Sequence, residues 1–524
     1  MKIPFKISSI FGGLSICDYF NVAGQFQASI GIDPDMPATD DGDKPSGYIR
    51  PTKMVKFNGS NVDSVPLFIV TNPKTEHIYV ILLNGKVIRY DKDLTNETLI
   101  GTMSTNVKGA DYYDNYIYIS TTIKIGRLGP MDGTVTLDTD YWNADLSKTA
   151  LTNNTYPSIN GVEIPNHQLH RHKDNRLYIC DVLAGNKGCL HFIETTKTTV
   201  EGDTDDGSTH TALDDFGYGV WPVCIGEYQT DLVVGLIEGV STNMKQKPAR
   251  IAFVDVASGT TQSIDITSIT SRELPDPLVT AIKNVNGTCY VFSGFATGGC
   301  RISKIVSGYS LEEVAWLPEQ YPPITESAVD HILNRFVFGS NTVEPEVAGA
   351  VFSIGAKSRG IPMGVHVPLR ATAVGANPWV TAVKYVQVNG KIIQPIIGWE
   401  DDTTVGLDKI TTGAGDGVIR LEVIVPETYG RNFILKELKI PFVQAMAADM
   451  GFTVYVYGDN AINNRTFKVG YSGTDVIAVK GKKQIILNPN IEFENNVFIQ
   501  IEFTGSVLLT IALPILGLLE TTEK

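Results

Sequence analysis

Short runs of alternating apolar and polar residues recur through the first two thirds of the chain. A period of two places the apolar side chains on one face of a β-strand. Two polar turn residues precede most of these runs, as at Asp114-Asn115 and Asn286-Gly287, where positive φ is tolerated at low cost. The pattern therefore predicts β-hairpins. The stretches that share it are "TEHIYVILLNGKVIRYD", "YDNYIYISTTIKIGRLG", "KDNRLYICDVLAGNKGCLHFIE", "YQTDLVVGLIEG", "VNGTCYVFSGFATGGCRISKI" and "ILNRFVFGSN".

The spacing of these hairpins predicts a β-propeller. Equivalent positions from Tyr79 to Val337 are separated by 39 to 60 residues, and a four-stranded propeller blade takes about 40 to 50 residues. A ring of such sheets covers both faces of each sheet and leaves only short edges. We expect six or seven blades over residues 55–358, and "DGTVTLDTDYWN", between Lys124 and Tyr178, is a candidate for the seventh.

The rest of the chain predicts a second all-β domain and an arm. Residues 359–524 hold longer strand candidates, from "VTAVKYVQVNGKIIQPIIGW" to "VFIQIEFTGSVLLTIALPIL", which is typical of an antiparallel β-sandwich or jelly roll. Residues 1–54 fit neither domain, because "GIDPDMPATDDGDKPSG" is too rich in aspartate, proline and glycine to supply a core. We expect an extended N-terminal arm that another subunit holds.

Charge and composition exclude several classes of protein. The 524 residues carry a net charge of −14, which would repel nucleic acid and anionic lipid. The six cysteines form no C-x-x-C pair, so most are expected to be buried thiols. The apolar start is interrupted by Ser8, Ser9, Gly12 and Gly13, unlike a signal peptide. The most apolar window, "VLLTIALPILGLL", is too short to cross a bilayer and predicts one or two buried final strands.

Two groups of residues have the chemistry of metal ligands. His167, His170 and His172 are closely spaced, but alternation along a strand puts only His170 and His172 on the same side, so a strand-edge or loop role is favoured over a metal site. Asp203 and Asp205 in "EGDTDDGST" depart from the EF-hand pattern, so a solvated turn is favoured over a calcium site. The same holds for the aspartates of the arm, Asp33, Asp35, Asp40, Asp41 and Asp43. No cofactor is expected.

Catalytic signatures are missing from the sequence. It contains no phosphate-binding P-loop, no G-x-S-x-G and no H-E-x-x-H motif. Glu400, Asp401 and Asp402 follow Trp399, but adjacent carboxylates in a turn cannot face each other across a sugar. We therefore expect no catalytic residues and no enzyme.

The opening "SIFGGLSICDYFNVAGQFQASIGIDPDMP", its continuation "SGYIRPTK" and the segment "RNFILKELKIPFVQAMAADM" resemble structural proteins of tailed-bacteriophage tails. The resemblance implies a virion component, made in the host cytoplasm, that assembles with copies of itself and other virion proteins through its arm and its sandwich. Strand addition by the arm would supply main-chain hydrogen bonds. The apolar arm residues expected to dock are Phe11, Tyr19, Phe20, Phe26 and Ile30.

Two other functions suit the same expected folds. The first is a carbohydrate- or receptor-binding module that binds a host-surface glycan, because aromatic rings stack on sugars; the alternative, which we favour, is that these rings fill the interfaces between blades. The candidate aromatic residues are Tyr141, Trp142, Tyr218, Trp221 and Trp399. The second is a propeller glycoside hydrolase, which requires carboxylates from separate blades to converge in the central channel.

Overall fold

The structure is a computed structural model in which the chain forms two compact units. One unit comprises Met1–Val55, Ala350–Ala371 and Lys409–Lys524, and the other comprises Lys56–Gly349 and Thr372–Asp408. The residues that the structure describes are 2–7, 13–14, 25–30, 32, 48–49, 51–103, 106–142, 151, 153–159, 162–183, 186–194, 216–238, 247–257, 265–332, 335–341, 350–354, 363–365, 379–388, 392–401, 404–412, 417–424, 432–459 and 464–522.

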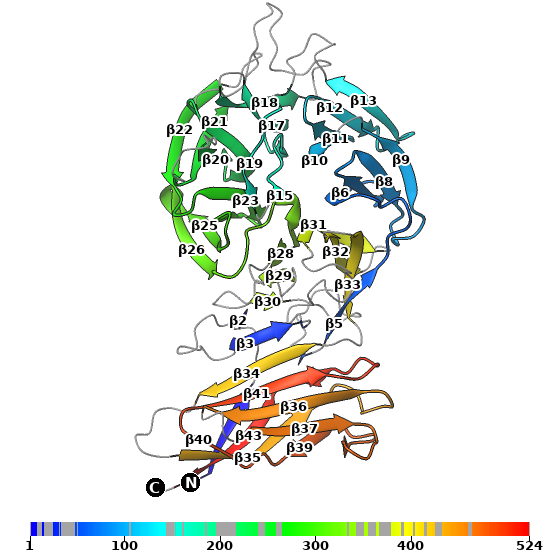
Figure 1. The fold of residues 1–524 in the computed structure, drawn as a ribbon, viewed down its shortest axis with the longest axis vertical. Coiled ribbons are helices and arrows are strands. Elements are labelled where there is room, and N and C mark those ends of the chain that lie inside the picture. The colour runs from blue at the N-terminus through cyan, green and yellow to red at the C-terminus, as the bar shows by residue number, and fades with distance from the viewer. Residues whose placement is uncertain are drawn as a thin grey trace, which may run out of the picture. The chain divides into compact units, whose positions relative to one another are not determined.

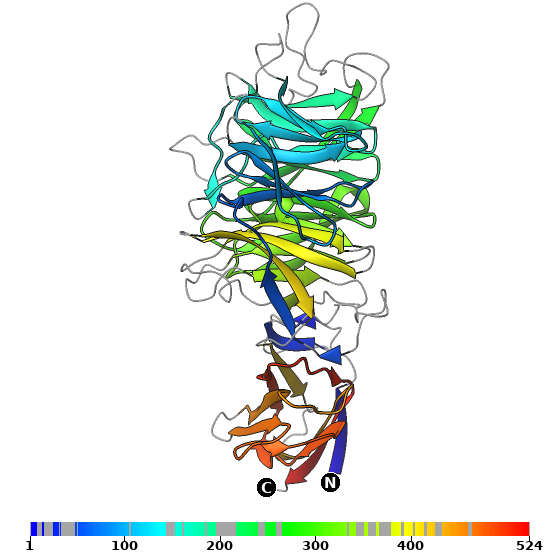
Figure 2. The ribbon, with the colours of Figure 1, turned by 90° about the vertical axis from the view of Figure 1, so that its right-hand side faces the viewer.

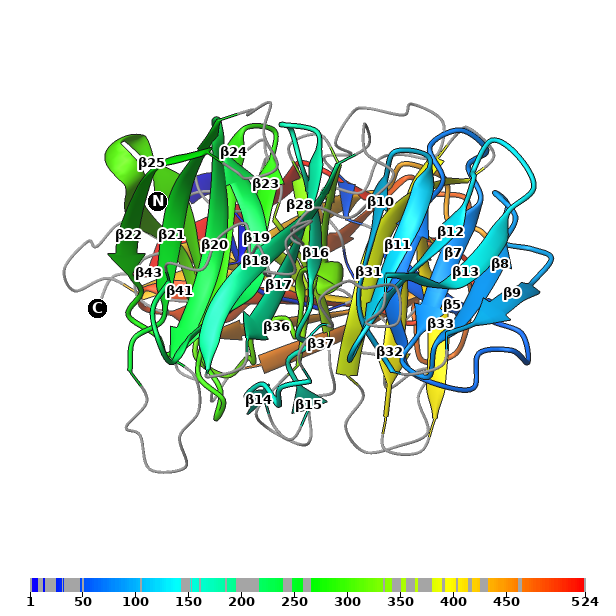
Figure 3. The same ribbon diagram turned by 90° about the horizontal axis from the view of Figure 1, so that it is seen from above.

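Antiparallel sheets follow one another around a ring in the second unit (Figure 1). Figure 3 shows the same sheets from the side of the ring. The first sheet contains β6 (Pro66–Thr71), β7 (Ile78–Leu82), β8 (Lys86–Tyr90) and β9 (Thr98–Thr102), and the second contains β10 (Val107–Tyr113), β11 (Tyr116–Thr121), β12 (Ile125–Gly129) and β13 (Thr136–Trp142). The third contains β16 (Leu169–His172), β17 (Arg176–Leu183) and β18 (Lys187–Glu194), and the hairpin β14 (Ser158–Ile159) and β15 (Val162–Glu163) precedes it. The fourth contains β19 (Val220–Tyr228), β20 (Asp231–Glu238), β21 (Arg250–Ala257) and β22 (Asp265–Glu273).

The order continues in the same way along the chain. The fifth sheet contains β23 (Leu278–Val285), β24 (Thr288–Gly294), β25 (Cys300–Val306) and β26 (Ser310–Leu317), with the 3-10 turn η2 (Ser307–Tyr309) before its last strand. The sixth has the order β27 (Val329–Ile332), β28 (Arg335–Ser340), β29 (Ala350–Ile354) and β30 (Met363–Val365), after the 3-10 turn η3 (Glu326–Ala328). Strands β29 and β30 belong to the segment Ala350–Ala371, which is grouped with the first unit. The last has the order β31 (Trp379–Val388), β32 (Ile392–Glu400), β33 (Val405–Thr412) and β5 (Thr52–Lys56).

Apolar clusters between neighbouring sheets hold the ring together. Val80 of the first sheet and Ala382 of the last belong to one buried cluster, so the ring closes on itself. Further clusters join the third sheet to the fourth and the fourth to the fifth. The sheets that these clusters join therefore bury apolar faces against one another, as in a propeller. The prediction of an all-β fold with a propeller is confirmed.

Two expectations about the ring differ from the structure. "DGTVTLDTDYWN" supplies β13, the outer strand of the second sheet, and no blade of its own. Residues 372–408, which we expected beyond a boundary at residue 358, belong to the ring unit. The difference has a physical reason: blade strands and sandwich strands share a period of two, so the pattern cannot assign a strand to either.

Two sheets with a common core form the first unit. One sheet has the order β1 (Lys2–Ile7), β43 (Ile515–Thr522), β35 (Asn432–Pro441) and β39 (Gln484–Leu487), and β40 (Ile491–Phe493) also pairs with β35. The other has the order β2 (Gly13–Leu14), β3 (Gln25–Ile30), β34 (Val418–Ile424), β41 (Asn496–Phe503), β36 (Gly451–Gly458), β37 (Asn464–Gly470) and β38 (Ile477–Ala478). A short pair, β4 (Tyr48–Ile49) and β42 (Ile511–Ala512), completes the unit. Leu435 and Leu519 of the first sheet and Val454 of the second lie in one buried cluster.

The expected free arm is contradicted by strand pairing within the chain. Strand β1 pairs antiparallel with β43 from Lys2↔Glu520 to Ile7↔Ile515, and Figure 2 shows the two chain ends close together. Strand β3 pairs antiparallel with β34 in the register Phe26↔Leu421 to Ile30↔Val418. The main-chain groups that were expected to bind another subunit are therefore used internally. Phe11, Tyr19 and Phe20 lie outside the described residues.

The described cysteines and parts of the last strands of the chain are buried, as the sequence analysis predicted. The five described cysteines, Cys180, Cys189, Cys224, Cys289 and Cys300, are all buried. The apolar window near the end supplies β42 and the first part of β43, and Ile511 and Ile515 are fully buried there. Among the described residues, no helix has the length and apolar character needed to span a bilayer.

Candidate functional site: a charged pocket at the centre of the ring

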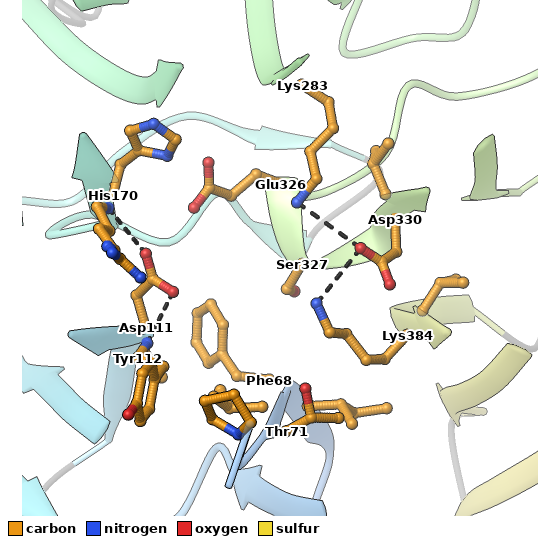
Figure 4. Close-up of a pocket in the computed structure, with 17 residues that line it drawn as sticks. Phe68, Thr71, Asp111, Tyr112, His170, Lys283, Glu326, Ser327, Asp330 and Lys384 are labelled. Carbon is orange, nitrogen blue, oxygen red and sulfur yellow. Dashed lines mark hydrogen bonds and ion pairs between the residues drawn. The ribbon is translucent and has the colours of Figure 1, made fainter. Parts of the chain in front are cut away.

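A cavity of about 410 Å³ lies among the first strands of the sheets in the ring unit (Figure 4). Strands β6, β10, β16, β23, β27 and β31 and the turn η3 all contribute to its lining. Because each of these strands begins its own sheet, side chains far apart in sequence meet here. Its charged residues are Asp111, Arg171, Lys283, Glu326, Asp330 and Lys384.

Two lysines share one carboxylate on one side of the pocket. Lys384 Nζ lies 3.3 Å from Asp330 Oδ1, and Lys283 Nζ lies 4.0 Å from the same oxygen. The other carboxylate oxygen accepts the Tyr385 N–H at 2.7 Å. Burial acts to raise the pKa of Asp330, but Lys384 and Lys283 outweigh burial and hold this pKa below its usual value. Asp330 therefore stays ionised, and two positive charges face one negative charge.

The pKa of Glu326 is shifted in the opposite direction to that of Asp330. Its carboxyl group lies in η3 at the pocket wall, and burial raises its pKa to about 8, with Lys283 opposing the shift. Glu326 is therefore mostly protonated at neutral pH and can donate a hydrogen bond into the pocket. A neutral carboxylic acid and an ionised carboxylate, Asp330, line one cavity, and the Glu326 carboxyl group points to the side where Asp111 lies (Figure 4).

A third carboxyl group, that of Asp111, comes from β10 across the pocket. Its oxygens accept the Tyr112 N–H at 2.7 Å and the Arg171 N–H at 2.9 Å. Burial raises the pKa of Asp111, and these two N–H groups partly offset the shift. The two main-chain donors orient the carboxyl group toward the pocket, where it can accept hydrogen bonds from a ligand.

His170, Phe68 and Tyr112 also line the pocket, and their rings make this part of the wall less polar. Burial lowers the pKa of His170 to about 3, so its ring is neutral. His170 Nε2 is buried and has no hydrogen-bond partner in the described part of the chain. A ligand that reaches this nitrogen would therefore satisfy a polar atom that is otherwise costly to bury.

A repeated short motif positions the ionisable residues, and our sequence analysis missed it. Lys283 is the last residue of "TAIK" in β23, and Lys384 is the last residue of "TAVK" in β31. Asp330 is the last residue of the similar "SAVD", which begins in η3 and ends in β27. Strands β10, β23 and β31 each have a register shift three residues before Asp111, Lys283 and Lys384, respectively. Such a bulge increases local twist and redirects the side chains that follow. The recurrence of a small-residue pair before a charged residue was the available signal.

His170 and His172, which we expected on the same side of a strand, do not form a metal site together. His170 faces the pocket, whereas His172 is buried and its Nδ1 lies 3.1 Å from Asp174 Oδ1. His167, before β16, is instead 3.1 Å from Asp181 Oδ1 through Nε2. Asp203, Asp205 and the aspartates of the segment 33–43 lie outside the described residues.

The predicted glycan-stacking tryptophans are buried. Trp142, Trp221 and Trp399 are 2%, 7% and 1% exposed, so their faces are closed to a sugar from solvent. Trp142 packs edge-on against His191, and Trp221 donates a hydrogen bond to Asn186. These tryptophans pack in the interior, where large aromatic rings bury extensive apolar surface. Asp401 closes a turn by accepting the Thr404 N–H at 2.6 Å.

Comparison with known proteins gives likenesses of fold alone. No known family model matches the sequence, and no curated protein sequence matches it either. The solved structures that resemble the chain include the computationally designed protein Ika8, the N-terminal domain of Nup159 and the β-propeller domain of Cps50 (Swd1) from Myceliophteria thermophila. Identities are 12%, 12% and 10%, with TM-scores of 0.35, 0.36 and 0.39. The matches cover 66%, 73% and 69% of this chain and 97%, 98% and 99% of the other chains.

Proposed function

We propose that the ring unit is a binding domain whose central pocket takes an acidic saccharide. The observation that supports this proposal is the convergence of two lysines and three carboxyl groups from separate sheets around one cavity. Ligand sites of this size combine apolar walls with a few placed polar groups. A binding role also agrees with the lack of catalytic motifs in the sequence.

The charges favour a ligand with a carboxylate. Lys283 and Lys384 share the single charge of Asp330, so these three side chains together carry one net positive charge that can attract an anion. A ligand carboxylate near the two ammonium groups would form charge-assisted hydrogen bonds, which are stronger than neutral ones.

The remaining groups suit the hydroxyls and the ring of a sugar. Protonated Glu326 can donate to a hydroxyl oxygen, and Asp111 can accept from a hydroxyl hydrogen. Tyr112, which is only partly buried, offers aromatic surface to the C–H groups of a sugar ring. A saccharide that carries a carboxylate uses all of these features at once.

The test is calorimetric titration with a uronate-containing oligosaccharide and with its carboxyl-reduced form. We expect the acidic form to bind at least about tenfold more tightly, which corresponds to about 1.4 kcal/mol. Lys283→Met and Lys384→Met should each weaken this binding by about tenfold or more, because each removes one partner of the anion. The matched control is Lys304→Met, because Lys304 lies on β25 outside the pocket and pairs with Glu312. This variant should leave binding unchanged. Equal affinity for the two saccharide forms contradicts the proposal.

Glycoside hydrolysis is the second candidate, because of the two protonation states in the pocket. A protonated acid, Glu326, and an ionised carboxylate, Asp330, are the pair that such a reaction uses. The same mixtures can be assayed for new reducing ends after prolonged incubation. We expect none; release that Glu326→Gln abolishes would replace binding with hydrolysis as the function.

A structural role in a phage tail stays a prediction. The route through a free arm has lost its support, since β1 and β3 pair within the chain. A saccharide-binding ring is compatible with a virion component that contacts a host surface. Mass spectrometry of purified particles for peptides of this chain would test the virion location.

A further inference from the structure

A second set of polar side chains is buried away from the pocket, in the third sheet of the ring. Its four members, the His–Asp–Cys–His cluster, are His167, Asp181, Cys189 and His191. All four are 0% exposed. The pocket does not include them, and no step of the proposed binding uses them.

Strand register brings three of these residues to one face. Asp181 of β17 is the direct partner of Cys189 of β18, and His191 lies two residues further along the same strand. Directly paired residues, and residues two apart on a strand, share a face. His167 reaches the same place from the segment before β16. Its backbone φ of 54° lies in the left-handed region, which a non-glycine residue keeps only where its surroundings hold it.

The donor atoms of Asp181, Cys189 and His191 lie close enough together to share one metal ion, and His167 contacts one of them. His167 Nε2 and His191 Nε2 each lie 3.1 Å from a different oxygen of Asp181, and Cys189 Sγ lies 3.9 Å from His191 Nε2. Ligand atoms about 2.0–2.3 Å from a tetrahedral zinc ion are separated from one another by roughly 3.3–3.8 Å. Asp181, Cys189 and His191 have ligand atoms within 4.8 Å of one another, and His167 joins them through its 3.1 Å contact with Asp181.

The hydrogen bond on the far side of His167 supports a metal ligand. His167 Nδ1 lies 2.8 Å from the carbonyl oxygen of Thr121, which can only accept, so Nδ1 carries a proton. The other ring nitrogen, Nε2, faces Asp181 Oδ1 at 3.1 Å. Metal-bound histidines commonly donate their other N–H to a carbonyl in this way.

We infer that the His–Asp–Cys–His cluster binds a structural zinc ion. One thiolate, two imidazoles and one carboxylate are the donor types that zinc accepts, and four protein ligands leave no open position for a substrate. The third sheet contains three strands among the described residues, where the sheets on either side contain four. A metal that joins β17 and β18 to the segment before β16 stabilises this sheet.

The first measurement is the metal content of the unmodified protein, purified without a metal-affinity column from zinc-supplemented cells. We expect about one zinc ion per chain by plasma mass spectrometry. We also expect zinc X-ray absorption to report one sulfur and three nitrogen or oxygen neighbours. Substoichiometric metal, or bound zinc with no sulfur neighbour, overturns the inference. This measurement does not depend on the folding of any variant.

A pair of cysteine variants provides the matched comparison. Cys189→Ala should lose the zinc and lower the melting temperature, whereas Cys180→Ala should keep one zinc ion per chain. Cys180 is an equally buried thiol of the same sheet, but it packs in the apolar cluster shared with the fourth sheet. A folded Cys189→Ala protein that retains its zinc overturns the inference.

Discussion

At the residue scale, the environment of single side chains sets their protonation. Glu326 shows this most clearly, because burial raises its pKa from 4.5 to about 8. The folded state therefore holds this proton more tightly than the unfolded state. The associated stability is fully present below about pH 4.5 and is lost as the pH rises through about 8.

Glu326→Gln should remove this part of the pH dependence. We expect the variant to gain stability relative to the original protein as the pH is raised from about 5 to about 8, because a neutral amide has no proton to lose. Urea unfolding of both proteins across that range measures the difference. Glu319→Gln, at an exposed position of the same unit, is the control and should run parallel to the original protein. A parallel profile for Glu326→Gln would contradict the raised pKa.

At the element scale, strand β1 shows how an apparently separate segment becomes part of a core. Its burial alternates, with Ile3, Phe5 and Ile7 partly buried against the core and the residues between them exposed. Gly517 of β43 lies directly under the Phe5 ring, where a side chain at that position would collide with it. The strand is therefore matched to its partner in register and in shape.

Phe5→Ser should lower the unfolding free energy of this unit by about 1–3 kcal/mol, since it removes partly buried apolar surface. Lys6→Ser, one residue further on the exposed face of β1, should change it by less than about 0.5 kcal/mol. Urea denaturation followed by circular dichroism measures both. Equal effects would mean that β1 is a loosely held arm, as the sequence had led us to expect.

At the scale of the whole molecule, closure of the ring joins distant parts of the chain. Phe57 N–H donates to Leu407 C=O at 3.1 Å, and Leu407 N–H donates to Asn58 Oδ1 at 3.1 Å. These bonds link residues about 350 positions apart, so they form only when every sheet between them is in place. Closure is thus a property of the complete ring.

Asn58→Ala should lower the unfolding free energy of the ring unit by about 1 kcal/mol, because the Leu407 N–H loses its acceptor. Hydrogen exchange should accelerate at Leu407 and its neighbours, while the amides of β20 in the fourth sheet stay protected. Asn153→Ala, at an exposed position, is the control and should alter neither quantity. Unchanged exchange at Leu407 would contradict this role of Asn58.

The sequence alone determined the hairpins, because turn geometry is local. Asp114, Asn115 and Asn286 have positive φ, as their residue types predicted. Buried thiols and the all-β class also followed from composition and period. The "TAIK" and "TAVK" motifs were present in the sequence, but their meaning depended on a bulge and on the ring axis.

The tertiary structure alone decided which strands share a sheet and which charges meet. A period of two is the same in a propeller and in a two-sheet domain, so residues 379–400 and the strands of residues 1–54 could not be assigned from pattern. Asp111, Lys283, Glu326 and Lys384 are far apart in the chain and meet only because the first strands of separate sheets converge. Their pKa shifts depend on that convergence, since desolvation and neighbouring charges arise only in the folded ring.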